Sequence, residues 1–489
     1  MNPPSSITGQ HRTWMLALMV TCAAAAVRWP GCDESFWLDE LHSAWTVWGS
    51  FGNVSQRAAI GNQTPIWFWT LWGFKGIAGD SESGLRLISV LTTSTACGLI
   101  TLLLARKYSL AAALAAGGVL AFESNAIFFG TELRPYGTVV LLATLAVVGS
   151  ARVMWIATAV AVSMQPTAVI VLLPWCIGRS WLIRNQSFRP GNQAQQVQGV
   201  DNPSAKVPWV IAIVAVLAIL IIVMTYVWPS LIARDRWASF ATAGGWNSIA
   251  SLWPWTWLLI LPSCVLIFAH KDSSPNINKA SVYLSILLII LSVGGLWFLS
   301  NMDWIHLWHR RYLISLLPVF ACLVSMAVES SSPPVRWPVA VLWLLGLTSA
   351  QGNLESLVTA PSAITRRGED WRSAIEFVST ETYYPIAMEA GLIESDAMMS
   401  KGGLTELESA YLTCVARGPY ELPVERVYPH RQPGDTRKFV WITRNRIGEQ
   451  LKSRASQIHQ FGSVKVVLGE RSTVRLKNDD KLKVSHPPD

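Results

Sequence analysis

Charged residues are scarce in this chain of 489 residues, in which Asp, Glu, Lys and Arg together make up 14%. The nine apolar types AVILMFWYC make up 51%, more than an ordinary soluble core requires, so the composition predicts a membrane protein. The basic residues leave a net charge of +8 but form no dense block. Scattered basic residues are typical of loops beside anionic lipid, so we expect membrane lipids and no nucleic acid among the partners.

The seven cysteines form no metal or redox motif. They stand singly, mostly inside apolar runs, without a CxxC pair or a Cys/His spacing that suits a metal. We interpret them as small hydrophobic residues. The sequence therefore assigns no metal site and no certain cofactor, and it leaves open only a divalent cation near Asp39 and Glu40.

Long apolar runs are abundant. A helix of about 20 apolar residues crosses a bilayer, and eight runs of suitable character lie at 12–29, 85–104, 110–128, 208–228, 254–270, 281–300, 312–328 and 337–350. The stretch 138–177 is divided by "SAR" and "QP" into three shorter helices. Together with the eight runs, this predicts about eleven transmembrane helices. A cleaved signal peptide is the alternative for the first run, but the many later runs favour a membrane helix or signal anchor.

The stretch 64–79, "TPIWFWTLWGFKGIAG", decides the topology of its surroundings. It is short and is interrupted by Gly73 and Lys75, as is typical of a segment that rests in the membrane interface. If it does not cross, "ARKYS" at 105–109 is cytoplasmic, as the positive-inside rule prefers. "TELRPYG" at 131–137 then lies on the outer side with the first loop.

The chain changes character after residue 350. Residues 1–350 form the predicted transmembrane domain, with a first outer loop at 30–84 and a polar linker without predicted structure at 178–207. From 351 to 489 the charge density rises and short β-like segments such as "KFVWITR" alternate with helical stretches such as "DWRSAIEFVSTE". We expect an α-helical polytopic inner-membrane protein with a C-terminal extracytoplasmic α/β domain.

The first outer loop holds the acidic segment "FWLDELHSAW" at 36–45. On a helical wheel, an apolar stripe faces one side and includes Trp37, Leu41 and Trp45, so we expect this face to dock on the membrane. Asp39 and His42 then face the water, where a carboxylate could act on a lipid-borne substrate. The alternative is that Asp39 and Glu40 are solvated acids near a helix N-terminus.

Two further blocks add arginines at the membrane edge. "TELRPYG" contributes Glu132, Arg134 and Tyr136. "WIHLWHRRYLISLLP" contributes His306, His309, Arg310, Arg311 and Tyr312. Arginines at the membrane edge are costly unless they face protein, headgroups or a bound anion. Guanidinium groups grip phosphate oxygens with paired hydrogen bonds, so we predict a phosphate site. Snorkelling to headgroups is the alternative for each arginine taken singly.

Five blocks in order resemble the bacterial GT-C glycosyltransferases similar to the protein O-mannosyltransferase and aminoarabinose-transferase families (glycosyltransferase 39-like). They are "WLDELHSAW", "NQTPIWFWTLWGFKGIAGDSESGLRLISVL", "FFGTELRPYG", "WHRRYLISLLP" and "RGEDWRSAIEFV". The resemblance covers about the first 380 residues. It implies an integral membrane enzyme of the cell envelope whose active site faces outward.

The resemblance also implies residue roles. Asp39 matches the first-loop catalytic base and Glu40 its neighbour, while Arg134, Tyr136, Arg311 and Tyr312 match the blocks that line the site near the lipid phosphate. Glu40, His42, Glu132, His309 and Arg310 complete the expected substrate-binding set. The chain departs from its relatives at Gln63 and Thr64, where an acid or lysine and two prolines are common, and "RPYGTVVLL" lacks the Asp that often follows the arginine.

We therefore predict a mannosyltransferase-like enzyme that moves one monosaccharide from a polyprenyl-phosphate donor to an unidentified protein, lipid or glycan acceptor, with inversion. The alternative is a transporter or lipid flippase in which the same charges line a polar path. The absence of repeated halves disfavours that alternative. A non-catalytic scaffold would not require so many helices.

Overall fold

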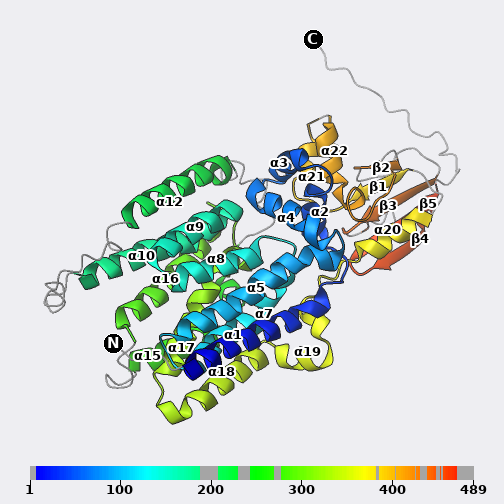
Figure 1. The fold of residues 1–489 in the computed structure, drawn as a ribbon. Helices are drawn as coiled ribbons and strands as arrows, with labels where there is room; N and C mark the ends of the chain where they lie inside the picture. Colours follow the sequence, from blue (N-terminus) through cyan, green and yellow to red (C-terminus); the bar gives the residue numbers. More distant parts are fainter. Residues whose placement is uncertain are drawn as a thin grey trace.

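The computed structural model describes residues 7–187, 208–229, 243–268, 277–380, 385–401, 403–423, 426–429, 438–445, 447, 452 and 455–470. A helical bundle fills one side of the molecule, and a small five-stranded sheet lies at the other side (Figure 1). The predicted fold class, mostly helical with a C-terminal α/β portion, is confirmed in this form.

The N-terminal portion is built from helices. Its elements are α1 (Ile7–Arg28), η1 (Trp29–Gly31), α2 (Leu38–Thr46), α3 (Phe51–Ile60), α4 (Pro65–Ala78), α5 (Glu82–Ala105), α6 (Leu110–Phe122), α7 (Ser124–Thr131), α8 (Tyr136–Val148), α9 (Ala151–Met164), η2 (Pro166–Ala168), α10 (Val169–Ser187), α12 (Pro208–Ile222), η5 (Val223–Val227), α14 (Trp246–Ala250), η7 (Thr256–Ile260), α15 (Leu261–Phe268), α16 (Lys279–Asn301), η8 (Arg310–Leu316), α17 (Leu317–Glu329), η9 (Pro333–Val335) and α18 (Arg336–Ala350).

The described part of the chain contains six helices that are long and apolar enough to cross a membrane, or up to seven if α6 and α7, bent by 56°, form one span. Three shorter apolar helices lie at Tyr136–Val148, Ala151–Met164 and Thr256–Phe268. The chain is thus a membrane protein, and the count of eleven stays a prediction. The span Arg310–Glu329 is 94% buried, so it lies at the centre of the bundle.

Serine side chains start several of these helices. Ser81, Ser109 and Ser150 each accept a hydrogen bond from a backbone N–H in the first turn of α5, α6 and α9. Such caps satisfy N–H groups that the helix cannot. The prediction that 178–207 form a linker without structure is wrong for 178–187, because these residues continue α10. Residues 188–207 lie outside the described residues.

The break between α6 and α7 is held by buried polar groups. The Arg28 guanidinium, 0% exposed, donates to the carbonyls of Leu120, Ala121 and Ala126 at 3.0–3.2 Å. Glu123 accepts from the Ala126 N–H at 2.8 Å. Carbonyls freed by a bend inside a membrane protein need such partners, and the bend directs the chain from Thr131 into the segment that carries Arg134.

Helix α4 is the 64–79 stretch of uncertain placement. It has 14 residues, which at 1.5 Å per residue is about 21 Å and shorter than the ~30 Å apolar core of a bilayer. It packs on α3, α5 and α9, and it leaves Trp69 and Ile77 exposed. Its position in the interface stays a prediction.

The C-terminal portion contains α19 (Asn353–Thr359), η10 (Pro361–Ile364), α20 (Trp371–Thr380), β1 (Ile386–Glu389), α21 (Ser395–Met399), α22 (Glu406–Leu412), η11 (Cys414–Ala416), β2 (Val427–Tyr428), β3 (Lys438–Thr443), β4 (Ala455–Phe461) and β5 (Val464–Glu470). The sheet order is β2-β1-β3-β5-β4. Strand β1 is parallel to β2 and β3, with Ile386 opposite Val440, and β5 is antiparallel to β3 and β4.

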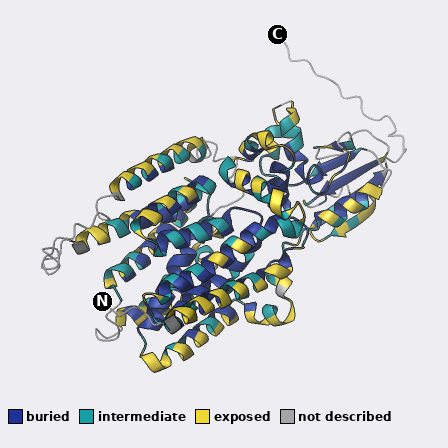
Figure 2. Ribbon diagram, viewed as in Figure 1, coloured by how far each residue is buried: buried dark blue, intermediate teal, exposed yellow. Residues whose placement is uncertain are grey.

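The sheet shares a hydrophobic core with the first loop. Phe36 and Trp45 of the first loop belong to the same buried cluster as Trp371 of α20 and Val440 of β3. The burial colouring shows this inner zone as dark blue beside the exposed yellow face of α20 (Figure 2). The loop at 30–84 is therefore fixed by the C-terminal portion as well as by the bundle.

Trp371→Ala should lower the thermal unfolding midpoint of the protein in detergent strongly. Its indole is 0% exposed in the shared cluster, and truncation of such a side chain costs about 3–5 kcal/mol. Ile458→Ala, on a side chain that is 46% exposed in β4, is the control and should shift the midpoint little. Equal shifts would show that the cluster does not stabilise the protein.

Candidate functional site

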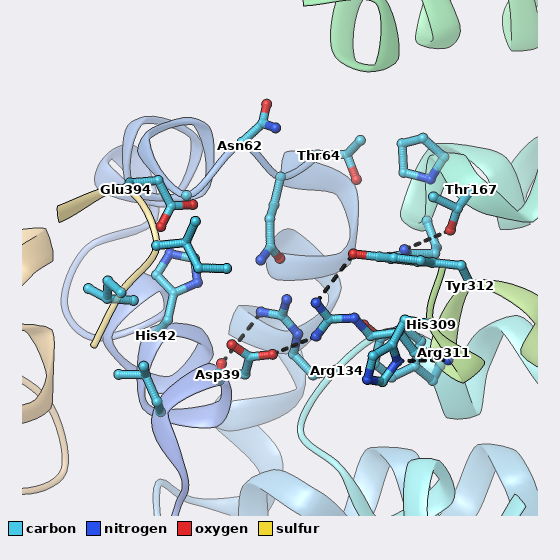
Figure 3. Close-up of a pocket in the computed structure, with 18 of the residues that line it drawn as sticks. Asp39, His42, Asn62, Thr64, Arg134, Thr167, His309, Arg311, Tyr312 and Glu394 are labelled. Carbon is cyan, nitrogen blue, oxygen red and sulfur yellow. Dashed lines mark hydrogen bonds and ion pairs between the residues drawn. The ribbon is translucent and has the colours of Figure 1, made fainter. Parts of the chain in front are cut away.

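A cavity of about 340 Å³ lies between one end of the bundle and the C-terminal portion. Figure 3 shows its polar side chains converging from several segments. The main groups that line it are Asp39 and His42 of α2, Asn62–Thr64, Arg134, Tyr136, Gln165–Thr167, Tyr226, His306, His309, Arg311, Tyr312, Gly391–Glu394, Tyr411 and Arg444.

Asp39 projects from the first turn of α2 into this cavity (Figure 3). Its Oδ2 atom forms an ion pair of 2.8 Å with Nη1 of Arg311, and its backbone carbonyl accepts from Nη1 of Arg134 at 3.4 Å. Burial would raise the pKa of the carboxyl, but Arg134 and Arg311 hold that pKa below its usual value. Asp39 is therefore an anion at neutral pH.

The two arginines reach the cavity from irregular backbone. Arg134 lies between the end of α7 and the start of α8, and Arg311 lies in the 3-10 turn of η8. Each is 8% exposed. Burial would lower the pKa of Arg134, but Asp39 and Tyr136 raise it. Two buried guanidinium groups beside one carboxylate leave an excess positive charge, which suits an anionic ligand.

The neighbouring histidines are neutral at pH 7. Burial and Arg134 lower the pKa of His42 to about 4. Burial and Arg311 lower the pKa of His309 to about 4. His42 Nε2 lies 3.4 Å from the carbonyl oxygen of Arg57 and 3.4 Å from Thr46 Oγ1. His42 and His309 therefore add no positive charge to the site.

Glu40 has a different environment from Asp39. It is 0% exposed, does not line the cavity and forms a salt bridge with Arg86. Its Oε1 also accepts from the backbone N–H of Leu133 at 2.8 Å. Arg86 in turn donates to the carbonyls of Cys32 and Ser35 at 3.0 and 3.3 Å. The structure thus places Glu40 in a buried clamp outside the cavity lining.

Two other predicted substrate-binding residues lie outside the cavity. Glu132 is 0% exposed and its two carboxylate oxygens have no hydrogen-bond partner among the described residues, and burial raises its pKa to about 8. Arg310 donates to the Ser251 carbonyl at 2.6 Å. The cavity lining includes neither. In contrast, His42, Arg134, Tyr136, His309, Arg311 and Tyr312 all line it with Asp39.

The apolar stripe of α2 does not face a membrane, contrary to our expectation. Trp45 is 1% exposed and Leu41 is 0% exposed. Trp45 packs against Tyr411 of α22 with ring centroids 6.2 Å apart, because the C-terminal portion covers this face. His42, predicted to face water, is also buried.

The block "RGEDW" connects the site to the sheet through Glu369. Its carboxylate accepts from the Leu38 N–H at 3.0 Å and from Arg444 at 2.6 Å. Asp370 instead caps α20 by accepting from the Ser373 N–H, and Arg372 pairs with Glu82 at 3.2 Å. Asp370 is therefore a helix cap and does not line the cavity.

Sequence reasoning missed several cavity residues. Glu394, Tyr411 and Arg444 come from the C-terminal portion, where no motif marked them. Gln165 and Thr167 also line the cavity and follow the end of α9. His306, in contrast, belongs to the block around Arg311 that the sequence had marked. The "QP" break at 165–166 was the available signal, because irregular backbone at membrane depth tends to line cavities.

The described residues contain no group of three or more His, Cys, Asp and Glu side chains that could hold a metal ion. Asp39 and Glu40 each pair with a different arginine and point into different networks. A divalent cation near them stays a prediction.

No protein-family model and no curated protein sequence matches the chain. Its fold matches two crystal structures of ArnT from Cupriavidus metallidurans. The apo structure has a TM-score of 0.51 at 10% identity and covers 92% of this chain and 97% of that chain. The structure bound to undecaprenyl phosphate has a TM-score of 0.51 at 12% identity and covers 93% and 98%. ArnT is an aminoarabinose transferase of the GT-C family, so the predicted resemblance is confirmed at the level of the fold.

Glu40→Gln should destabilise the protein by about 3–5 kcal/mol, because it leaves the buried Arg86 without its anion. The readout is the thermal unfolding midpoint in detergent, with Asp80→Asn as the control because Asp80 is an exposed acid. An unchanged midpoint in Glu40→Gln would contradict the clamp.

Proposed function

We propose that this protein is a membrane glycosyltransferase that moves one monosaccharide from a polyprenyl-phosphate-linked donor to an acceptor, with inversion at the anomeric carbon. The observation that carries the proposal is one cavity that holds a carboxylate and two buried arginines, Asp39, Arg134 and Arg311. The fold is similar to that of ArnT, and one ArnT crystal structure contains undecaprenyl phosphate. This similarity supports a lipid phosphate as the ligand of the cavity.

In this reaction the arginines bind the donor phosphate. A phosphodiester carries one negative charge, and a second develops on the phosphate oxygen as its bond to the sugar breaks. Guanidinium groups that already contact the phosphate when this bond breaks stabilise the developing charge. Tyr312 accepts from Arg311 Nη2 at 3.2 Å, which helps to orient the guanidinium.

Asp39 is the proposed general base. The acceptor oxygen attacks the anomeric carbon from the face opposite the phosphate, the new C–O bond forms, and the acceptor proton passes to the Asp39 carboxylate. The carbon–oxygen bond to the phosphate breaks with its electrons, which leave with the polyprenyl phosphate. A carboxylate fixed beside both reactants gives general-base catalysis and positions the acceptor.

The location of the reaction is part of the proposal. We place the cavity at the extracytoplasmic face of the inner membrane, with residues 351–489 as an outer α/β domain over its mouth. This domain contributes Glu394, Tyr411 and Arg444 to the cavity, so it is suited to select the acceptor. The acceptor is a protein, a lipid or a glycan.

Asp39→Asn should slow sugar transfer by about 10² to 10⁴ fold, because the amide keeps the shape and removes the base. The assay is transfer of radiolabelled sugar from polyprenyl-phosphate donors to membrane acceptors by purified protein in liposomes. Asp33→Asn, on an exposed acid of the same loop, is the control. Transfer by Asp39→Asn at the wild-type rate would exclude Asp39 as base, and transport of donor without any transfer would favour the flippase alternative.

A cysteine introduced as Ser400→Cys should react with a membrane-impermeant maleimide in intact cells, because residue 400 lies on the proposed outer domain. Arg152→Cys, on a predicted cytoplasmic segment, should react only after the membrane is opened. Both positions are exposed, and the background carries Cys22→Ser and Cys264→Ser to remove the exposed native thiols. The reverse labelling pattern would contradict the orientation.

A further inference from the structure

Arg311 and Asp39 form an ion pair with each other, but the proposed reaction needs Arg311 at the donor phosphate and Asp39 at the acceptor proton. Nη1 of Arg311 donates to Asp39 Oδ2 at 2.8 Å, and Nη2 donates to the Tyr312 hydroxyl at 3.2 Å. A guanidinium grips a phosphate through two parallel N–H groups. The fork of Arg311 therefore faces Asp39 and Tyr312 in this state, and Asp39 holds a cation where a proton acceptor is required.

We propose that Arg311 changes partner when the donor binds: its guanidinium leaves the Asp39 carboxylate for the lipid phosphate, and this exchange frees Asp39 to act as the base. The inference rests on the proposed function and adds to it an order of events. The donor must bind before the acceptor can be deprotonated.

The geometry favours Arg311 over Arg134 as the group that moves. Arg134 contacts Asp39 only through the backbone carbonyl, at 3.4 Å, and reaches Ser43 Oγ at 3.5 Å. Arg134 could therefore bind a phosphate without giving up a hydrogen bond to the Asp39 carboxylate. Arg444, the third arginine that lines the cavity among the described residues, is held by Glu369 at 2.6 Å and is not positioned to replace Arg311.

The electrostatics of the exchange also fit the reaction. While Arg311 is paired with Asp39, the arginines hold the pKa of the carboxyl low, which makes it a weak base. A phosphate that neutralises Arg311 removes part of this effect, so Asp39 becomes a stronger base once the donor is present.

The charges balance through the chemical step. Arg134, Arg311, the Asp39 carboxylate and one phosphodiester carry charges that sum to zero before transfer. Afterwards the phosphate has gained one negative charge and Asp39 has gained the acceptor proton, so the sum is again zero. These four groups therefore stay balanced through the chemical step without a further ion.

The test is binding of undecaprenyl phosphate to purified protein in detergent, measured as the apparent dissociation constant by thermophoresis. If the phosphate competes with Asp39 for Arg311, Asp39→Asn should bind this lipid about tenfold more tightly than the wild type, because the competing anion is gone. Glu394→Gln is the matched control, since it removes a carboxylate that faces the same cavity without an ion pair to Arg311 (Figure 3). It should gain much less affinity.

The outcomes separate the two levels of the proposal. Equal or weaker binding by Asp39→Asn, or an equal gain in Glu394→Gln, overturns the exchange while the transferase reaction can still stand. Failure of the wild type to bind the lipid overturns the proposed donor and the exchange together.

A second measurement needs no variant. In a structure of the wild type with undecaprenyl phosphate, the guanidinium of Arg311 should contact the phosphate, and its Nη1 should lie beyond the ~4 Å limit of a salt bridge from Asp39. Phosphate bound with the 2.8 Å pair intact would overturn the exchange.

Discussion

The buried clamp of Glu40 on Arg86 fixes the position of the candidate site. Arg86 belongs to α5, Glu40 to α2, and the carboxylate of Glu40 also accepts from the backbone of Leu133. Three separate segments thus meet at one carboxylate that is 0% exposed. Because Asp39 precedes Glu40 and Arg134 follows Leu133, this clamp brings the proposed base and one proposed phosphate ligand to the same cavity.

The site itself is assembled where helices stop. Arg134 follows the end of α7, Gln165–Thr167 follows the end of α9, and His309 precedes the 3-10 turn of η8. In a regular helix the backbone N–H and C=O groups are hydrogen-bonded to each other. Irregular backbone inside a membrane protein is stable only where it is surrounded by protein or lines a cavity. The breaks therefore supply both the space of the cavity and the freedom to aim polar side chains into it.

Much of this arrangement could be predicted from the sequence, because motifs and apolar runs are local. The blocks around Asp39, Arg134 and Arg311 identified residues that line the cavity. The helical wheel separates Glu40 from Asp39 by about 100°, and Glu40 does not line the cavity. For Glu132 and Arg310 the sequence did not indicate the direction of the side chain, and they do not line it either. The helical wheel found the apolar face of α2, but the partner that covers it, Tyr411, lies far along the chain. Glu394 and Arg444 carried no motif at all.

Photocrosslinking tests the central claim, that a lipid phosphate occupies this cavity, most directly. An undecaprenyl phosphate analogue with a photoreactive group next to its phosphate would be irradiated with the wild-type protein, and the labelled peptides would be identified by mass spectrometry. The account predicts labels on peptides that contain Arg134–Tyr136 or His309–Tyr312, and their loss under excess undecaprenyl phosphate. Labels confined to the exposed apolar residues of α12 would contradict it.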